Sequence, residues 1–304
     1  MTHQPKVSII ILNWNGLKDT LECLTSLSKI AYPNYKVIVV DNGSKNQDAS
    51  IIKQKFPSVK IIKNKTNLGF AEGNNAAIRR ILKQNQSDYI LLLNNDTVVT
   101  KDFLNRLVKT AQNYQKSGIL GPKIYYYLSR NKKNVIQSIG SMINLSLGKI
   151  SPVKQKNNRP LAVDFVTGAC LLIKTAVVKK IGLLDKKFFC VFEDADWCLR
   201  VKTAGFLILY VPRSIIYHKL GQTIKKTSPV YYYTRNLFWF EFKHAHPFQL
   251  LFFLAHYFIF VFPVYCFGYL IVKRNINLWK NYFRGVFEGI FSKHTLPAVF
   301  FAPA

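Results

Sequence analysis

Acidic residues are scarce in this sequence. Its 304 residues include 15 Asp and Glu against 43 Lys and Arg, which gives a formal net charge of +28. Charge of this sign attracts polyanions such as nucleic acid, anionic lipid headgroups or phosphorylated substrates. The alternative is a generally Lys-rich composition, because the lysines are spread along the chain and form no single block. Hydrophobic residues make up 49% of the chain, which excludes a disordered protein. The few carboxylates are informative, and three of them lie together at Glu193, Asp194 and Asp196.

Cysteine is also scarce, and its spacing excludes two common kinds of site. The five cysteines are scattered, form no CxxC pair and are odd in number. This pattern argues against a disulfide framework or a zinc ribbon and predicts a reduced, cytosolic setting. The first residues, MTHQPKVSIIIL, contain a short apolar run without a small-residue cleavage site, so we expect no signal peptide. The sequons at Asn64, Asn95 and Asn144 are then chance matches.

The first hundred residues alternate between apolar runs and amphipathic stretches. The apolar runs predict buried strands at 7–12, 36–41, 59–62 and 89–93, and the other stretches predict helices at 18–30, 47–55 and 76–84 with a Gly- and Asn-rich loop at 67–75. Uniformly apolar strands separated by helices are typical of an α/β fold whose mostly parallel sheet has helices on both faces. Ligands of such sheets bind beyond the carboxyl ends of the strands, where Asp41 and Asp96 lie.

The pattern weakens after residue 118 and changes character after residue 236. We expect a strand at 118–127, loops at 128–160, a strand within 163–173 and a helix at 175–181. Between Lys243 and Lys273 lie 29 residues without a formal charge, which is long enough to cross a bilayer; a buried core helix is the alternative. Because basic residues flank both ends and Pro263 interrupts the run, we expect a kinked or re-entrant helix pair at the cytoplasmic membrane face. The chain thus divides into residues 1–236 and a C-terminal hydrophobic helical region at 237–304.

Seven short motifs follow one another along residues 6–240: VSIIILNWNG, VVDNGS, NLGFAEGNN, LLLNNDT, VTGACLLIK, FEDADWCLR and YYYTRN. In this order and spacing they resemble family 2 glycosyltransferases of the GT-A fold, in the branch that includes bacterial rhamnosyltransferases of surface polysaccharide synthesis. The resemblance implies an inverting enzyme that moves a sugar from a nucleotide diphosphate sugar, a UDP- or dTDP-sugar with dTDP-rhamnose as one candidate, to a lipid-linked saccharide. It implies work at the cytoplasmic face of the membrane and no nucleic acid partner.

A sugar nucleotide needs a carboxylate for the donors of its base or ribose and an open backbone beside its phosphates. The resemblance gives the first role to Asp41, with Asn13 beside it in the nucleotide pocket. An Asx turn that closes the strand is the structural alternative for Asp41. The other residues that the resemblance places at the donor are Asn67, Gly69, Asn74, Asn94, Asn95, Gly168, Ala169 and Arg235. A structural salt bridge explains Arg235 nearly as well.

The motif LLLNNDT stands where the family has its DxD motif, with Asn94 in place of the first Asp. Asp96 is then the carboxylate left to bind Mg²⁺ or Mn²⁺, and Asn94 or Asn95 is expected at the ribose. One carboxylate with two phosphates is enough for Mg²⁺, which keeps several waters. His218 matches a position where the family often has a His that reaches the metal or the diphosphate, and a structural role for this His fits the sequence equally well.

Glu193 and Asp194 match the family's ED motif. An acceptor hydroxyl is a poor nucleophile near neutral pH and needs a carboxylate to take its proton. We assign this role to Asp194, with Glu193 as the alternative, and expect repulsion among the neighbouring acids to raise at least one pKa. The structural alternatives are that Asp194 caps a helix over 197–204 and that Arg200 pairs with Asp196.

Two other classes of function compete with a glycosyltransferase. A sugar-phosphate nucleotidyltransferase also combines an α/β sheet with a carboxylate-bound metal, but it needs a Gly-rich basic loop after the first strand, where this chain has NWNGLKDT. A non-enzymatic basic module for nucleic acid or anionic membrane would explain the charge but not the strand-end carboxylates. Loss of activity on changing Asp194 would separate an enzyme from such a module.

Overall fold

The structure, a computed structural model, describes residues 4–127, 135–154, 158–219 and 229–292. Its contacts divide the chain into two compact units. The first comprises residues 1–142, 152–189 and 193–223, and we call it the sheet unit; the second comprises residues 143–151, 190–192 and 224–304, and we call it the helical unit. The boundary that we predicted at residue 236 lies inside helix α7 (Pro229–His244), which belongs wholly to the helical unit because it packs along α10 (Ile276–Phe291).

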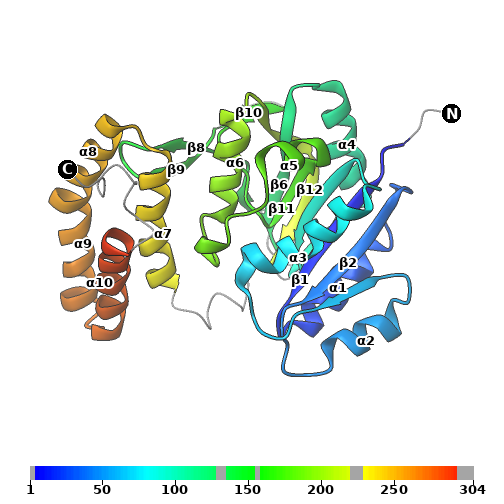
Figure 1. The fold of residues 1–304 in the computed structure, drawn as a ribbon, viewed down its shortest axis with the longest axis horizontal. Coiled ribbons are helices and arrows are strands. Elements are labelled where there is room, and N and C mark those ends of the chain that lie inside the picture. Colours follow the sequence, from blue (N-terminus) through cyan, green and yellow to red (C-terminus); the bar gives the residue numbers. More distant parts are fainter. Residues whose placement is uncertain (1–3, 128–134, 155–157, 220–228, 293–304) are drawn as a thin grey trace, which may run out of the picture. The chain divides into compact units, whose positions relative to one another are not determined.

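The sheet unit alternates strands and helices, as predicted (Figure 1). Its strands are β1 (Val7–Asn13), β2 (Tyr35–Asp41), β3 (Lys60–Lys63), β4 (Tyr89–Asn94), β5 (Thr97–Val99), β6 (Ser117–Tyr126), β7 (Ile136–Ser138), β10 (Leu161–Val163), β11 (Cys170–Lys174) and β12 (Leu207–His218). Its helices are α1 (Leu17–Leu27), α2 (Asp48–Lys55), α3 (Gly69–Gln84), α4 (Phe103–Asn113), α5 (Thr175–Ile181), the 3₁₀ turn η1 (Lys186–Phe188) and α6 (Glu193–Thr203). Two further strands, β8 (Ser141–Asn144) and β9 (Lys149–Pro152), pair with each other as a separate two-stranded sheet.

One mixed sheet organises this unit, with the strand order β10-β12-β6-β11-β4-β1-β2-β3. Strand β1 runs parallel to both β2 and β4, β2 runs parallel to β3, and β12 runs parallel to β6. Strand β11 is antiparallel to both of its neighbours, β4 and β6. The α/β class and the parallel core of the sheet are therefore confirmed, and β11 reverses the direction at the centre.

The sheet is buried on both faces, which explains why its strands are apolar throughout. Along β1, Ile9 and Ile11 point to the face that is covered by α1, α2 and α4, whereas Ile10 points to the face that is covered by α3, α5 and α6. Successive side chains of a strand point to opposite faces, so a strand that is covered on both sides must be apolar at every position.

Two local predictions were wrong. The segment expected as a loop at 67–75 contains the start of α3 at Gly69, because Gly69 takes a positive φ of 78° and turns the chain directly into the helix. The segment expected as loops at 128–160 contains the short strands β7, β8 and β9, whose few residues carry no clear period. Residues 128–134 and 155–157 of that segment lie outside the described residues.

The helical unit is held together by aromatic side chains and close helix contacts. The Phe238 ring of α7 packs against the rings of Phe253 and Tyr257, with centroids 5.5 and 4.7 Å apart. The Tyr257 hydroxyl donates a hydrogen bond to the hydroxyl of Tyr282 on α10 at 2.9 Å. A Cβ atom at Gly285 of α10 would lie 2.9 Å from the Tyr231 carbonyl oxygen, so glycine is what lets α10 approach α7 this closely.

The apolar run forms one continuous helix of 26 residues from Pro247 to Val272, with a mean hydropathy of 2.1. It comprises α8 (Pro247–His256), the π-helical turn η3 (Tyr257–Val261), α9 (Phe262–Phe267) and the π-helical turn η4 (Gly268–Val272). The helix does not turn back at Pro263, as a re-entrant pair within the run would require. The chain turns at residues 273–275 instead, where α10 begins after the Asn275 side chain accepts a hydrogen bond from the Leu278 N–H.

Candidate active site

The carboxyl ends of the central strands bring the predicted site residues of the sheet unit to one edge. The pairing of β1 with β2 sets Asn13 opposite Asp41, and the pairing of β1 with β4 sets Leu12 opposite Asn94. Because β11 is antiparallel to β4, the turn that precedes it reaches the same edge, and the Asn94 N–H donates to the Ala169 carbonyl at 3.0 Å.

The predicted nucleotide end of the site is a network of buried amides. The Asn13 amide donates to Ser44 Oγ at 3.1 Å and to Asp48 Oδ2 at 3.0 Å, and its oxygen accepts from Thr20 Oγ1 at 2.7 Å. Asn13 is fully buried, and its hydrogen bonds connect the end of β1 to Ser44, Asp48 and Thr20. Asp41 Oδ1 accepts a hydrogen bond from the Ser44 N–H at 3.2 Å, which is the turn contact expected of the structural alternative. Its second oxygen has no hydrogen-bond partner among the described residues, and so it is the atom that a ligand would meet.

Asn42, which the sequence analysis did not single out, is the centre of the loop that leads into α3. Its amide donates to Asn67 Oδ1 at 2.8 Å and to the Gly69 carbonyl at 3.1 Å, while its oxygen accepts from Asn64 Nδ2 at 2.9 Å. The Asn74 amide donates to the Phe70 carbonyl one turn earlier, at 2.9 Å. The side chains of Asn67 and Asn74 are therefore engaged in shaping the loop, and contact with a donor through them stays a prediction.

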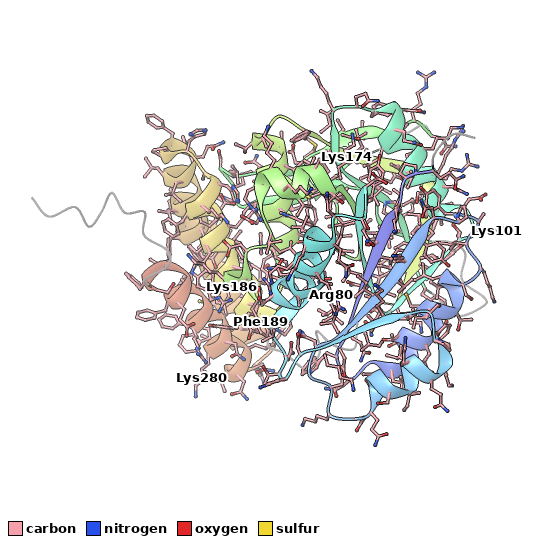
Figure 2. All side chains as sticks on the ribbon, turned by 45° about the vertical axis from the view of Figure 1, so that its right-hand side comes forward. Arg80, Lys101, Lys174, Lys186, Phe189 and Lys280 are labelled. Atoms are coloured by element: carbon pink, nitrogen blue, oxygen red, sulfur yellow. The ribbon has the colours of Figure 1, made fainter. Side chains whose placement is uncertain are left out.

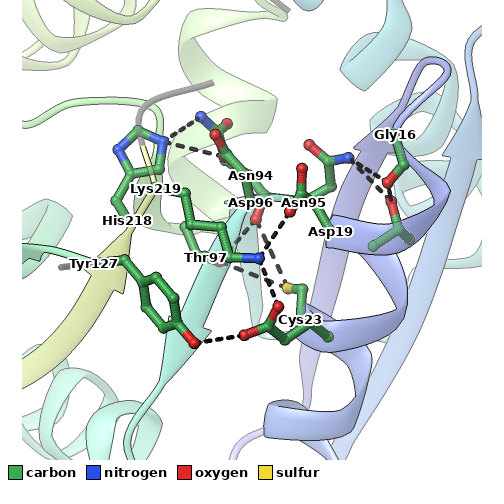
Figure 3. Close-up of polar contacts among 12 residues, drawn as sticks. Gly16, Asp19, Cys23, Asn94, Asn95, Asp96, Thr97, Tyr127, His218 and Lys219 are labelled. Atoms are coloured by element: carbon green, nitrogen blue, oxygen red, sulfur yellow. Dashed lines mark hydrogen bonds and ion pairs between the residues drawn. The ribbon is translucent and has the colours of Figure 1, made fainter. Parts of the chain in front are cut away.

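The predicted metal residues meet at the ends of β4 and β12 (Figure 3). His218 Nε2 lies 3.1 Å from Asp96 Oδ1 and 3.4 Å from Asn94 Nδ2, and Gln137 Oε1 lies 3.0 Å from His218 Nδ1. Gln137 Oε1 is placed to accept from Nδ1, and Nε2 is the ring atom directed at the Asp96 carboxylate. An imidazole nitrogen and a carboxylate oxygen at this distance attract each other only when a proton or a cation lies between them.

This pair fits a divalent cation that takes its remaining ligands from a substrate. A carboxylate oxygen and an imidazole nitrogen are both ligands of Mn²⁺-like cations, and phosphate oxygens and waters would complete the coordination. Within the described ranges no group of three or more His, Cys, Asp or Glu side chains is arranged to hold a metal ion. Asn95 points elsewhere, since its amide donates to Thr20 Oγ1 at 3.0 Å and lies 3.4 Å from the Gly16 carbonyl.

Lys219 fixes the end of β12 next to His218 (Figure 3). Its Nζ atom lies 2.7 Å from Asp19 Oδ1 and 2.6 Å from Glu22 Oε2, and both acids belong to α1. Its backbone N–H donates to the Asp96 carbonyl at 3.0 Å. These contacts hold the strand that carries His218 against the loop that carries Asp96, and no sequence motif pointed to them.

The acidic cluster lies in the first turn of α6, which begins at Glu193 and therefore four residues earlier than predicted. Asp194 does not cap a later helix. Its Oδ2 accepts from the Gly168 N–H at 2.7 Å and its Oδ1 accepts from the Ala195 N–H at 2.9 Å. Asp196 is fully buried and pairs with Arg200 at 2.9 Å, which confirms the structural interpretation of that arginine.

The two acids of the ED motif differ in their surroundings. Burial, and next the charge of Asp194, hold the pKa of Glu193 well above its usual range, and Glu193 Oε2 has no hydrogen-bond partner in the described part of the chain. Burial also raises the pKa of Asp194, while the N–H groups of Gly168 and Ala195 oppose the rise. Burial is therefore a larger cause than the repulsion that the sequence suggested. Asp194 is partly exposed and Glu193 is not, so Asp194 is the carboxylate that a substrate can reach.

Gly168 separates Asp194 from the start of α3. A Cβ atom at this position would lie 3.2 Å from the Phe70 ring and 3.4 Å from the Asp194 Cβ atom. Ala169 follows it as a buried small residue. Of these two small residues predicted at the donor, Gly168 thus lies between the Asp194 side chain and the Phe70 ring of α3.

Arg235 lies in the helical unit, on α7, among aromatic rings. Its guanidinium carbon lies 4.1 Å from the Trp239 ring centroid and 5.1 Å from that of Tyr232, and its Nε donates to Asn236 Oδ1 at 3.0 Å. Cation–π contacts of this kind stabilise a guanidinium. Contact of Arg235 with a diphosphate stays a prediction.

Asn236 is a residue whose role the sequence did not reveal, although it belongs to the YYYTRN motif. It is fully buried, and its amide donates to the carbonyls of Cys190 and Val191 at 2.8 and 2.7 Å. Val191 and Phe192 have φ values of 70° and 75°, which L residues with bulky or β-branched side chains rarely adopt. Asn236 therefore holds a strained backbone segment that immediately precedes Glu193 in the sequence.

The chain is similar to several known proteins. Residues 4–239 match a family model described as "Glycosyltransferase like family 2". The chain is 30% identical over 241 residues to an uncharacterized protein of Sinorhizobium fredii, a match that covers 72% of this chain but only 25% of that protein. It is 26% identical over 223 residues to the N-acetylglucosaminyl-diphospho-decaprenol L-rhamnosyltransferase of Mycobacterium tuberculosis, covering 66% of this chain and 72% of the relative. Among solved structures, the mannosyltransferase PcManGT from Pyrobaculum calidifontis, in complex with GDP-Man and Mn²⁺, superposes with a TM-score of 0.60 at 12% identity, covering 96% of this chain and 89% of that one.

Proposed function

Because the chain belongs to glycosyltransferase family 2 and has the GT-A fold, we propose that it is an inverting glycosyltransferase of surface polysaccharide or glycolipid synthesis. Its donor is a nucleotide diphosphate sugar, and its acceptor is a lipid-linked saccharide. The similarity to a rhamnosyltransferase that acts on a lipid-linked sugar supports a UDP- or dTDP-sugar donor, with dTDP-rhamnose as the first candidate.

One observation carries the proposal: a partly exposed carboxylate, Asp194, is fixed by two backbone N–H groups at the same sheet edge as the Asp96 and His218 pair. A carboxylate held in one orientation can take a proton from a hydroxyl without first reorganising. In the reaction, the acceptor oxygen forms a bond to the anomeric carbon while the bond from that carbon to the diphosphate oxygen breaks. Asp194 takes the proton of the hydroxyl, and a single displacement of this kind inverts the anomeric centre.

The residues around the donor have separate roles in this proposal. The free oxygen of Asp41 accepts a hydrogen bond from the base or ribose, and Gly168 leaves room for the sugar beside Asp194. Asp96 and His218 hold Mg²⁺ or Mn²⁺. When bound, the cation neutralises the charge that develops on the departing diphosphate. Gln137 orients the imidazole through Nδ1, which leaves Nε2 directed at Asp96.

The apolar helix supports a place at a membrane surface. Phe248, Leu251, Val264 and Val272 are between 64% and 79% exposed, although water-exposed helices rarely carry such side chains. The exposed bases Lys273 and Arg274 follow the helix directly, and each base near an anionic surface contributes about 1 kcal/mol. We propose that the helix lies at the interface of the cytoplasmic leaflet and does not span the bilayer.

Labelling of intact cells tests this topology. A cysteine introduced near the C-terminus should stay unlabelled by a membrane-impermeant reagent added outside, and it should be labelled after the cells are opened. Efficient labelling of intact cells would mean that the helix spans the bilayer. That result would leave the assignment of the catalytic residues untouched.

Donor binding tests the catalytic proposal. We expect calorimetry with a panel of UDP-, dTDP- and GDP-sugars in Mn²⁺ to reveal one preferred nucleotide. Asp96→Ala should weaken binding by about tenfold or more, because the variant lacks the carboxylate of the cation site. Asp102→Ala is the matched control, since it removes an exposed acid of the sheet unit outside this site. Equal affinities of the Asp96 variant and the wild type would contradict the assigned site.

A further inference from the structure

A depression lies on the sheet unit, away from the strand ends described above. It has a volume of about 300 Å³ and lies between α4, the segment at 158–160 and the middle of β12. We call it the arginine groove, because its lining includes Arg106, Arg159 and Arg213 together with Lys109, Asn113 and Asn158. β10 is the last strand of the sheet on the side of the groove, and β12 is its neighbour. β1 and β2, which carry Asn13 and Asp41, lie toward the opposite side of the same sheet.

A bulge in β12 brings Arg213 to this groove. The pairing of β12 with β6 is interrupted between Val211 and Ile215, although their partners Pro122 and Lys123 are consecutive. The three extra residues are firmly held. Ser214 is fully buried and its Oγ donates to the Phe103 carbonyl at 2.8 Å, at the start of α4. The backbone that carries Arg213 is therefore fixed against the helix that carries Arg106 and Lys109.

The groove concentrates exposed positive charge from α4 and β12. Arg106, Lys109 and Arg213 are exposed and make no ion pair with the described residues, and no acid lines the groove. Asp102, one turn before Arg106 on α4, forms no ion pair with it either. Like charges that converge on one hollow repel each other, and an anion bound between them removes the repulsion.

The choice of residue type separates this groove from the generally basic surface. The chain has 33 lysines and 10 arginines, and three of those arginines line this single depression. Elsewhere on the sheet unit, lysines such as Lys101, Lys174 and Lys186 are spread over different segments (Figure 2), and the three basic residues that line another depression, Lys6, Lys36 and Lys60, are all lysines. Guanidinium groups bind phosphate oxygens through two parallel hydrogen bonds, which a lysine ammonium cannot do.

We propose that the arginine groove is a binding site for a phosphate-bearing ligand, separate from the donor site. Arg106 and Arg213 bind the phosphate oxygens from opposite walls, and Lys109 adds charge. The side-chain amides of Asn113 and Asn158 supply neutral donors and acceptors for the rest of the ligand. A volume of about 300 Å³ is at the lower end for small-molecule sites, so it fits a sugar phosphate or one lipid headgroup.

Calorimetry on the purified full chain tests this proposal. The soluble probe is glucose 1-phosphate, and the headgroup probe is a vesicle of phosphatidylglycerol. Both titrations contain EDTA, so that no cation recruits phosphate to Asp96. Arg106→Gln with Arg213→Gln should weaken binding of at least one probe by about tenfold or more, as expected for loss of charge-assisted hydrogen bonds.

The matched control removes the same charge from α3, by Arg80→Gln with Lys83→Gln. Both side chains are exposed, and Figure 2 shows Arg80 on α3. This control should bind both probes like the wild type. Selective loss of glucose 1-phosphate would identify a soluble ligand, and selective loss of vesicle binding would identify a headgroup. Equal effects of the two double variants, or no binding of either probe by the wild type, would overturn the proposal.

Discussion

Asp194→Asn should separate the chemistry of this side chain from its place in the fold. Both carboxylate oxygens accept hydrogen bonds from backbone N–H groups, those of Gly168 and Ala195. Asparagine has only one side-chain oxygen, so one of these N–H groups loses its acceptor and faces an amide NH₂ group instead. A donor left unsatisfied in a mostly buried place costs about 1–3 kcal/mol. We therefore expect a measurable loss of stability, although asparagine often replaces aspartate without harm at helix ends.

The loss of turnover should be far larger than this loss of stability explains. Removal of a general base lowers kcat by about 10²- to 10⁴-fold. The donor affinity of the variant should stay close to that of the wild type, because Asp41, Asp96 and His218 are unchanged. Initial rates with a radiolabelled donor measure the first quantity and calorimetry measures the second, both at a temperature where urea titration shows the variant to be folded.

Glu193→Gln is the matched control. Burial holds the pKa of Glu193 well above its usual range, which favours the uncharged carboxyl group that glutamine mimics. We expect its turnover to stay within a few-fold of the wild type. The reasoning is refuted if this variant loses more turnover than Asp194→Asn, or if Asp194→Asn keeps full turnover. In the wild type, kcat should rise with pH through the raised pKa of Asp194, because only the ionised carboxylate takes a proton.

Two further predictions concern the helical unit. Asn236→Ala removes both hydrogen bonds to the backbone of Cys190 and Val191, and it should lower the free energy of unfolding in urea by about 1–3 kcal/mol. An unchanged free energy would mean that residues 190–192 keep their conformation without these hydrogen bonds. Burial raises the pKa of Glu241 to about 9 from an ordinary 4.5, so the folded state binds its proton more tightly than the unfolded state does. The free energy of unfolding of the wild type should therefore fall as the pH rises from about 4.5 to about 9, by up to about 1.4 kcal/mol per pH unit from this group. Glu241→Gln should remove this dependence on pH. Parallel pH profiles of the variant and the wild type would contradict the assigned burial.

The strands and the strand-end residues could be predicted from the sequence because one physical cause dominates there. A strand covered on both faces must be apolar throughout, so the run from Val7 to Leu12 has few alternatives. The polar residues that end such runs then fall at one edge by topology alone. Asp41, Asn94 and Asp96 could therefore be assigned to the same end of the sheet from the sequence alone.

Contacts between distant residues could not be predicted in this way. Gln137 comes from a short strand with no motif, yet it orients His218 from 81 residues away. The segment at 67–75 is rich in Asn and Gly, which favour loops. The positive φ of Gly69 and the hydrogen bond from the Asn42 amide to the Gly69 carbonyl nevertheless allow α3 to begin within this segment. Propensity describes each residue alone, whereas these contacts depend on which partner the fold brings near.

The backbone before Glu193 is strained close to the proposed catalytic residue Asp194. Phe189, Val191 and Phe192 all have positive φ values, and each such residue costs of the order of 1–3 kcal/mol. Conformations of this kind persist only when other contacts hold them. The Phe189 carbonyl accepts from the Phe70 N–H at 2.6 Å, and Asn236 holds the carbonyls of the next two residues. The residue after the last strained position opens α6, and Asp194 follows it. The hydrogen bonds to Phe189, Cys190 and Val191 therefore stabilise the backbone conformation of the segment that precedes Asp194, the proposed general base.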